Sequence, residues 1–312
     1  MSCRVAGLLT LFGVALAPAC IASQSTLLTA LEGSPPPPVL EPTATGLTTG
    51  PAALWADPTA DPHATGLFFG MSHASYASVR VFHAALGFRM GPRWSLAFAS
   101  TVLGNLFDTS LTNQDPSLEN LRAQAAWARL DATVSVRRFA VSVGVELAGD
   151  DNVGVFQSST LASAHIRLYP LQGDRVAVGF RETRAIGGSV PMRSGGRQAI
   201  DFTLNQPLGR SSLSITAAVS RGGLWRYSET RTGYAVAAQL SVLSQLDLGA
   251  ALGRYSTAYG ASQDEWYRSA VAAVRVGTFR LGTRYTSTRL GVGSGFGVSL
   301  AYEPLRGQRS LD

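Results

Sequence analysis

Arginine and acidic residues recur at alternate positions along several segments of the chain, as in Arg129 and Asp131 or Arg280 and Arg284. A guanidinium group matches the geometry of a carboxylate, so arginines lining a channel could draw in anions or bind the carboxylate of a ligand. The same arginines could instead pair with acids and water and hold the interior in shape. Both interpretations concern one set of residues: Arg129, Asp131, Glu146, Arg167, Arg181, Arg197, Asp201, Asp247, Arg275, Arg280 and Arg284.

The 4 histidines raise the question of catalysis. His165 shares its alternate-residue phase with Ser163 and Arg167. A nucleophile needs a base within hydrogen-bond reach and a third group that orients the base. We find no such triad, and no histidine pair has the spacing of metal ligands. The sequence therefore predicts no catalytic residue, no metal and no cofactor; a surface hydrolase would need a Ser or His whose replacement abolishes cleavage while the fold survives.

The segment FAVSVGVELAGDD shows which element carries these charges. Apolar residues occupy every second position from Phe139 to Leu147, and Ser142, Gly144 and Glu146 lie between them. Successive side chains of an extended chain leave opposite faces, so this period indicates a strand with one apolar face. Such a strand fits either the wall of a packed all-β domain or a membrane barrel with lipid outside and a lumen inside.

Composition favours a β-rich membrane protein over a nucleic-acid-binding one. Charged residues make up 15% of the chain, against about 25% in ordinary soluble domains. The net charge is +6 and all 26 basic residues are arginines, with no clustered basic run. No nucleic-acid partner is expected from this pattern.

The N-terminal part of the chain differs from the rest. Residues 1–22 have the short basic region, apolar run and small residues of a secretory signal peptide, and both cysteines lie in it. In a second reading Cys20 is the acylated residue of a weak lipobox. Residues 23–63 contain eight of the fifteen prolines and no sustained alternation, so they form a linker or plug.

Alternating segments of about ten residues, the length of a tilted membrane strand, fill residues 64–303 and leave 304–312 as a tail. Short turns such as GPR and SQ alternate with longer polar loops, so all long loops fall at one end and both termini at the other. The expected strands are 64–73, 76–89, 93–103, 121–136, 139–149, 157–169, 174–184, 196–206, 211–220, 230–242, 245–256, 265–276, 279–288 and 292–303.

The charges lie on one side of these segments and the large apolar residues on the other. An arginine facing lipid at mid-depth would cost about 2–4 kcal/mol, which explains the sorting if the apolar face meets a bilayer. On this basis Val143→Arg should impair insertion, whereas Ser142→Arg on the inner face should be tolerated. The predicted fold is an all-β, antiparallel transmembrane β-barrel of about 14 strands with an N-terminal periplasmic plug, in the outer membrane of a two-membrane bacterium.

The stretch from Ala53 to Ser100 resembles the start of outer-membrane barrels of the long-chain fatty acid transporter (FadL) superfamily, particularly its PorV/PorQ-like branch. The resemblance rests on Trp55, Asp57 and Pro58 before the first strand, on MSH at 71–73 and on the Gly-Pro-Arg turn at 91–93. It implies a barrel partly blocked by its N-terminal segment. Members of the FadL type pass hydrophobic molecules, and members of the PorV type act as scaffolds in protein secretion.

Two groups of residues are candidates for function beyond the charged set. We expect Leu54, Trp55, Asp57 and Pro58 to form either a movable plug or a rigid cap at the periplasmic mouth. The loop residues Leu106, Phe107 and Trp225 should face outward, where they line a hydrophobic entry, dock a partner or belong to an aromatic girdle.

Two functions are compatible with these features. The first is a passive conduit for hydrophobic or amphipathic small molecules. The alternative is a non-conducting, PorV-like scaffold that binds secreted or surface proteins through its outer loops. The expected partners are outer-membrane lipid and either a hydrophobic small-molecule ligand or a secreted protein.

Overall fold

The computed structural model describes residues 51–62, 64–74, 79–106, 122–152, 155–171, 175–188, 196–222, 231–243, 245–256, 264–288 and 295–304. The predicted signal peptide (1–22), most of the linker (23–63) and most of the tail (304–312) lie outside these residues. Within them, no helix has the length and apolar character to cross a membrane.

One short helix precedes a long series of strands. The helix is α4 (Pro51–Ala56). The strands are β1 (Gly66–Ala74), β2 (Val79–Arg89), β3 (Trp94–Leu106), β4 (Arg122–Val136), β5 (Phe139–Asn152), β6 (Val155–Leu168), β7 (Val176–Gly188), β8 (Arg197–Leu208), β9 (Ser211–Gly222), β10 (Arg231–Val242), β11 (Leu246–Ser256), β12 (Asp264–Val276), β13 (Phe279–Thr288) and β14 (Gly295–Tyr302).

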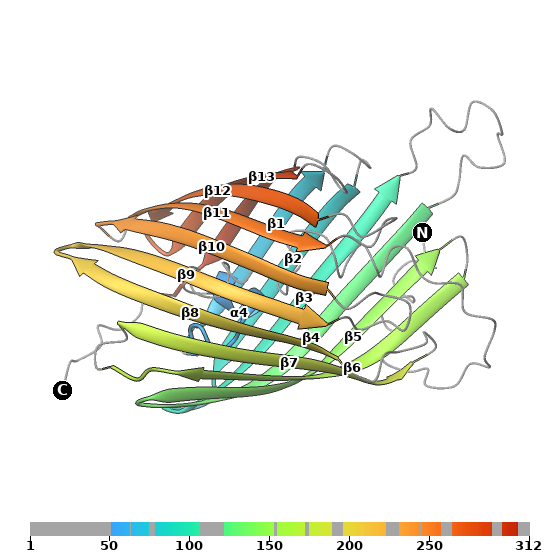
Figure 1. Cartoon of the computed structure of the whole chain (residues 1–312), viewed down its shortest axis with the longest axis horizontal. Coiled ribbons are helices and arrows are strands. Elements are labelled where there is room, and N and C mark those ends of the chain that lie inside the picture. Colours follow the sequence, from blue (N-terminus) through green and yellow to red (C-terminus); the bar gives the residue numbers. More distant parts are fainter. Residues whose placement is uncertain are drawn as a thin grey trace.

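The strands form a closed barrel in which each one pairs with its neighbours in the chain (Figure 1). The barrel closes where β1 pairs antiparallel with β14, in a register that sets Phe69 opposite Leu300. Closure leaves no strand edge with unpaired amides and carbonyls, which is the condition for a sheet to lie in lipid. The predicted antiparallel barrel of about 14 strands is confirmed.

Several strands run further toward the long loops than the sequence pattern indicates. β3 ends at Leu106 instead of 103, β5 at Asn152 instead of 149 and β7 at Gly188 instead of 184. The backbone ladder continues in the first two cases, since Leu106 pairs with Arg122 and Asn152 with Val155. Side-chain alternation marks only the part of a strand with two different environments, so it does not detect these extensions.

The two faces of the wall have opposite character along each strand. On β5, Val143 is 59% exposed on the outer face, whereas the adjacent Ser142 is fully buried on the inner face. The same alternation sets Ile200 and Phe202 outward on β8 and Asp201 inward. The apolar face is therefore the outside of the barrel.

Exposed aromatic side chains lie near both ends of the wall. Trp94, Phe279 and Tyr302 lie on the outer face at the end with the short turns, and the rings of Phe279 and Tyr302 are 5.5 Å apart. Tyr234 and Trp266 lie on the outer face at the opposite end. Two such girdles, with aliphatic residues between them, are typical of a barrel that spans a bilayer.

The structure changes one expectation about the inner face. The Ser142 hydroxyl donates to the carbonyl of Ala132 and lies 2.9 Å from the Thr133 hydroxyl, with no exposed surface left. An arginine does not fit there, so Ser142→Arg is no longer expected to be tolerated. Val271 on β12 is the better control, because it faces inward and is 40% exposed.

We predict that Val143→Arg impairs insertion into lipid vesicles while Val271→Arg does not, although both replace a strand valine by arginine. The outward arginine must enter the bilayer at a cost of about 2–4 kcal/mol, and the inward one meets the lumen. The folded fraction can be measured from the mobility of unheated samples on denaturing gels. Equal folded fractions for the two variants would contradict the assignment of faces.

Candidate functional site

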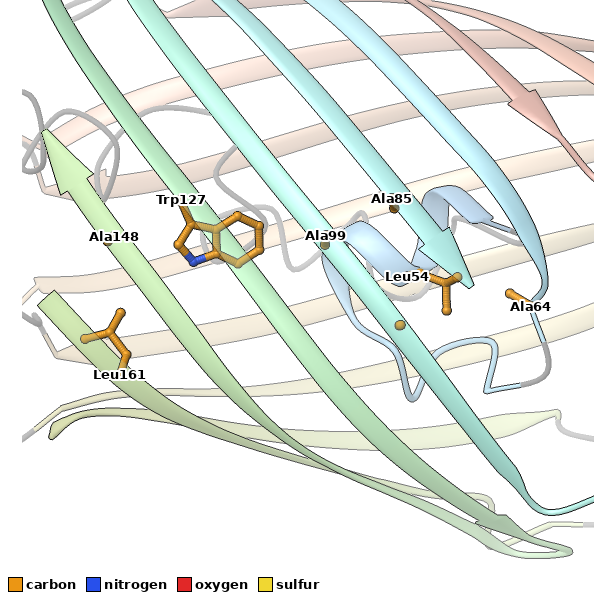
Figure 2. Close-up of a cluster of buried hydrophobic side chains, with 8 residues drawn as sticks. Leu54, Ala64, Ala85, Ala99, Trp127, Ala148 and Leu161 are labelled. Atoms are coloured by element: carbon orange, nitrogen blue, oxygen red, sulfur yellow. The ribbon is translucent and has the colours of Figure 1, made fainter. Parts of the chain in front are cut away.

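The candidate site is formed where residues 51–64, here called the luminal segment, meet the inner wall of the barrel. Helix α4 packs against β1, β2, β3 and β14. Leu54 is 1% exposed and belongs to an apolar cluster with inward-facing residues of the wall, among them Ala85 and Ala99 (Figure 2). The described part of the segment therefore lies inside the barrel.

A glycine makes room for this segment. At Gly87, on the inner face of β2, an added Cβ would lie 2.3 Å from Cδ1 of Leu54 and 2.7 Å from the carbonyl oxygen of Ala64. No side chain can occupy that space while the segment is in place. A glycine on the inner phase of a strand often marks such a close approach, and this is the signal in the sequence that could have predicted the contact.

Asp57 ends α4 and shapes the turn that follows. Its amide donates to the carbonyl of Ala53 at 2.7 Å, and its carbonyl accepts from the amide of Ala60 at 3.1 Å. Its Oδ1 accepts from the amide and the hydroxyl of Thr59, at 2.8 and 2.6 Å. An aspartate that binds the backbone two residues on stabilises a tight turn. The turn leaves Oδ2 directed at the wall.

The wall binds this carboxylate through β6. Nη2 of Arg167 lies 3.1 Å from Oδ2 of Asp57 and also donates to Asp201 at 2.9 and 3.1 Å. Nδ1 of His165 lies 3.3 Å from Oδ1 of Asp57. Arg167 and Asp201 are almost completely buried, so this ion pair is shielded from solvent. Removal of one partner of such a pair typically costs about 3–5 kcal/mol.

Two further side chains of the wall bind the backbone of the segment. Nη2 of Arg129, on β4, donates to the carbonyl of Leu54 at 2.9 Å. The hydroxyl of Tyr169, just beyond β6, donates to the carbonyl of Thr59 at 3.2 Å. The segment is thus attached to the wall through both its helix and its turn. Asp57, which lies between the helix and the turn, makes a charged contact with the wall.

Arg129 also belongs to a buried network on β4 and β5. Its Nε lies 2.5 Å from Oδ2 of Asp131, and its guanidinium lies 5.2 Å from the ring centroid of Trp127. The indole of Trp127 in turn donates to Glu146 at 2.9 Å. The network holds the Arg129 guanidinium in one orientation, where it reaches the luminal segment.

The luminal segment adds negative charge to a wall that carries several buried arginines. Among the described side chains of β4 to β8, the buried arginines are Arg129, Arg167, Arg181 and Arg197, and the buried acids are Asp131, Glu146 and Asp201. The luminal segment supplies two more buried carboxylates, Asp57 and Asp61. Loss of the Asp57 carboxylate removes one of the negative charges that offset the buried arginines, which is unfavourable.

Glycines also make space for the charged side chains. An added Cβ at Gly144 would lie 2.4 Å from Oδ1 of Asp131, and one at Gly179 would lie 2.3 Å from Oδ2 of Asp201. Both glycines face inward on strands whose neighbours carry the charges. The alternate-residue pattern predicts the charged residues but not the glycines that let them approach one another.

The pKa of the Asp57 carboxyl is held well below its usual range. Burial acts to raise this pKa, but the contact with His165 and the positive charges of Arg167 and Arg181 outweigh the burial. The carboxyl therefore stays ionised inside the barrel, and its attraction to the wall persists into acid solution.

The other predicted charged residues lie apart from this site. Asp247 on β11 contacts Arg280, and Arg275 contacts Glu303, all on the inner side near the short-turn end. Asp247 also accepts from the hydroxyl of Ser241. Arg284 lies further from the short-turn end of β13, where its Nε donates to the hydroxyl of Thr286 at 3.2 Å. The predicted set thus divides between two regions of the inner wall.

A second part of the inner wall carries small side chains and has accessible space beside it. Val271 on β12 is 40% exposed, and it pairs with Gly249 of β11 on one side and with Arg284 of β13 on the other. The inward-facing residues Ala251, Ala273 and Gly282 are small as well. We call these residues of β11 to β13, from Gly249 to Gly282, the small-residue face.

Some of the predicted site residues lie outside the residues that the structure describes. Trp55 belongs to α4, but its side chain is not described, and Phe107 and Trp225 lie outside the described residues. Pro58 is buried in the luminal segment, beside Asp57. Leu106, expected in a loop, is the last residue of β3, because the ladder with β4 reaches Arg122.

Among the residues the structure describes, no group of three or more His, Cys, Asp and Glu side chains could hold a metal ion.

A closed antiparallel barrel with an apolar exterior and a polar interior defines the class of outer-membrane β-barrels. The chain matches no protein-family model, and it matches no curated protein sequence. Its fold is similar to the CymD monoaromatic hydrocarbon channel, with a TM-score of 0.55, 9% identity and coverage of 84% of this chain and 97% of that one. It is also similar to a Pseudomonas aeruginosa FadL homologue, with a TM-score of 0.52, 11% identity and coverage of 83% and 96%. These similarities show the outer-membrane barrel fold.

We predict that Gly87→Ala displaces the luminal segment while the barrel still folds. The added methyl group would overlap Leu54 and the carbonyl of Ala64, so the backbone amides between 53 and 61 should lose protection from hydrogen exchange. Gly91→Ala is the matched control, because nothing lies within 4 Å of a Cβ at that position. Unchanged protection in Gly87→Ala would show that the segment does not depend on this space.

Acid should release the segment. The pKa of Asp57 is lower when the segment is bound than the ordinary value of about 3.9 expected after release. Binding is therefore at full strength above the ordinary value and weakens as the pH falls below it toward the depressed pKa. We expect the protection factors of amides 53–61 to be constant above about pH 5 and to fall in stronger acid. Asp57→Asn should show low protection without this acid step; the same acid step in Asp57→Asn would assign it to another group.

Proposed function

We propose that this protein is a gated outer-membrane conduit for hydrophobic or amphipathic small molecules, with the luminal segment as its gate. The observation that carries the proposal is the attachment of the segment to the inner wall through one buried carboxylate, Asp57. Leu54, Arg129 and Tyr169 also hold the segment, so its bound state is defined, and loss of the charged contact is a local change that weakens it. The barrel itself need not unfold when the segment leaves.

The inner wall supports a path beside the gate. The small-residue face leaves accessible space next to β11 to β13, whereas β4 to β8 carry the charges that bind the segment. Release of the segment would join this space to the volume that α4 now occupies. Glycine, alanine and valine offer few hydrogen bonds to a solute, which suits a poorly hydrated molecule better than a sugar or an ion.

The proposed solute class also agrees with the structural neighbours. CymD is described as a monoaromatic hydrocarbon channel, and the second neighbour is a FadL homologue. We propose the same type of solute for this chain. Amphipathic acids belong to the same proposed class if their carboxylate replaces Asp247 or Glu303 as a partner of Arg280.

A non-conducting PorV-like scaffold is the second candidate. The observation that favours it is the extent of the buried network, because Arg129, Arg167 and Asp201 contact one another or the luminal segment and fill one side of the lumen. In that case the segment is a permanent cap, and the outer loops bind a secreted or surface protein. Breaking the Asp57 contact should raise the conductance of a gated barrel but not that of a permanently closed one.

We predict that Asp57→Asn raises the conductance of the protein in planar bilayers several-fold. The amide keeps the shape of the side chain but loses the charge that Arg167 binds, and removal of one partner of a buried pair costs about 3–5 kcal/mol. Entry of labelled toluene into cells with an intact outer membrane should rise in parallel. Glu182→Gln is the matched control, because it removes a carboxylate that pairs with Arg184 on the outer face.

The outcomes separate the proposals. Conductance of Asp57→Asn no higher than that of Glu182→Gln would contradict the gate and favour the scaffold. Raised conductance without faster toluene entry would keep the gate and contradict the solute class. A protein partner retained in native mass spectra of the extracted barrel, with no small ligand, would also favour the scaffold.

A further inference from the structure

Exposed arginines gather at two short turns of the barrel. Arg89 and Arg93 flank the turn between β2 and β3, and Arg137 and Arg138 form the turn between β4 and β5. The two stretches, RMGPR and RR, contain no acidic residue. We call Arg89, Arg93, Arg137 and Arg138 the short-turn arginine cluster.

Backbone hydrogen bonds hold these turns side by side. The carbonyl of Arg93 accepts from the amide of Ser135 at 2.9 Å, which attaches the first turn to the last residues of β4. The carbonyl of Arg138 accepts from the amide of Tyr169 at 2.8 Å, which attaches the second turn to the end of β6. The arginines therefore lie on one continuous part of the rim, from β2 to β6.

The side chains of the cluster bind no carboxylate. Nε of Arg89 donates to the carbonyl of Gly91 at 3.0 Å, which holds this guanidinium over its own turn. The ion pair of β4 lies inside the barrel, between Arg129 and Asp131. Among the described residues, no ion pair involves a member of the cluster. The positive charges of the cluster are thus available to a partner.

The depth of the cluster is set by its apolar neighbours. Each arginine is adjacent in the chain to a large, exposed side chain on the outer face, and these are Phe88, Trp94, Val136 and Phe139. Aromatic residues at a strand end lie at the level of the lipid headgroups. Short turns of outer-membrane barrels face the periplasm. The arginines therefore lie where the phosphates of the inner leaflet can reach them.

We propose that the short-turn arginine cluster binds an anionic phospholipid of the inner leaflet, with Arg93, Arg137 and Arg138 around its phosphate. A guanidinium binds phosphate through two parallel hydrogen bonds, and basic clusters at a membrane surface bind anionic headgroups. The acyl chains would lie against the apolar outer face of β3 to β6, which exposes Val143 and Ile166. The site rests on the placement of the barrel in the outer membrane but not on the gate or on the solute.

The test is the lipid that the purified full-length protein retains in native mass spectrometry, after incubation with an equimolar mixture of phosphatidylglycerol and phosphatidylethanolamine. Both lipids carry a phosphate, but only the first has a net negative charge. Wild type should retain phosphatidylglycerol roughly tenfold better, since each basic group near a membrane surface adds severalfold to the binding of an anionic lipid. Arg137→Gln combined with Arg138→Gln should lower this preference at least about threefold. The turn should survive, because Arg138 contacts Tyr169 through its backbone carbonyl.

The matched control removes the same charge from the other end of the barrel. Arg221 on β9 and Arg268 on β12 are exposed toward the long loops, and their replacement by Gln should leave the preference unchanged. Equal loss in both double variants would reduce the effect to net charge and overturn the site, as would no loss in either. Equal retention of the two lipids by wild type would overturn the lipid site without any variant, and it would favour an acidic protein as the partner of the cluster.

Discussion

The buried contact between Asp57 and Arg167 is the interaction on which the arrangement inside the barrel depends. Arg167 is also bound to Asp201, so the luminal segment is attached to a guanidinium that the wall already holds in place. Asp57 in turn is oriented by its own turn, because Thr59 donates to Oδ1 and Oδ2 is left facing Arg167. Each side is thus preorganised before they meet, which reduces the conformational entropy lost on binding. The remaining contacts of the segment, from Leu54 and from the backbone of Thr59, add area and hydrogen bonds around this charged centre.

The barrel separates two problems that a soluble domain must solve together. Its outer face needs only apolar side chains and aromatic girdles, while its inner face can hold charges, glycines and a bound segment. The same separation explains why charges inside are paired and those outside lie at the ends. Arg129 and Asp131 bind each other in the interior, whereas Arg254 lies beside Trp266 on the outer face near the long-loop end.

The strands and their faces could be predicted from sequence, because alternation between lipid and lumen leaves a period of two in strands such as β5 and β8. The ends of β3, β5 and β7 could not, since beyond the bilayer both faces meet water and the period disappears. Asp57 was identified through its place in a motif before the first strand, but its partners were not. Arg167 and His165 are distant in sequence, and only the closure of the barrel brings β6 opposite the luminal segment. Gly87, Gly144 and Gly179 were missed because a glycine carries no pattern of its own; its meaning depends on which side chain fills the space.

The most direct test of the central claim is a double-mutant cycle across Asp57 and Arg167, with Asp57→Asn, Arg167→Gln and the double variant compared with wild type. The free energy of binding the luminal segment is measured from the hydrogen-exchange protection of amides 53–61 in each protein. If the two side chains bind each other as described, the single losses are not additive, and the coupling energy is at least about 1.5 kcal/mol, as for other close charge pairs. Additive losses, with a coupling energy near zero, would show that Asp57 is not held by Arg167 and that the segment stays in the barrel for another reason.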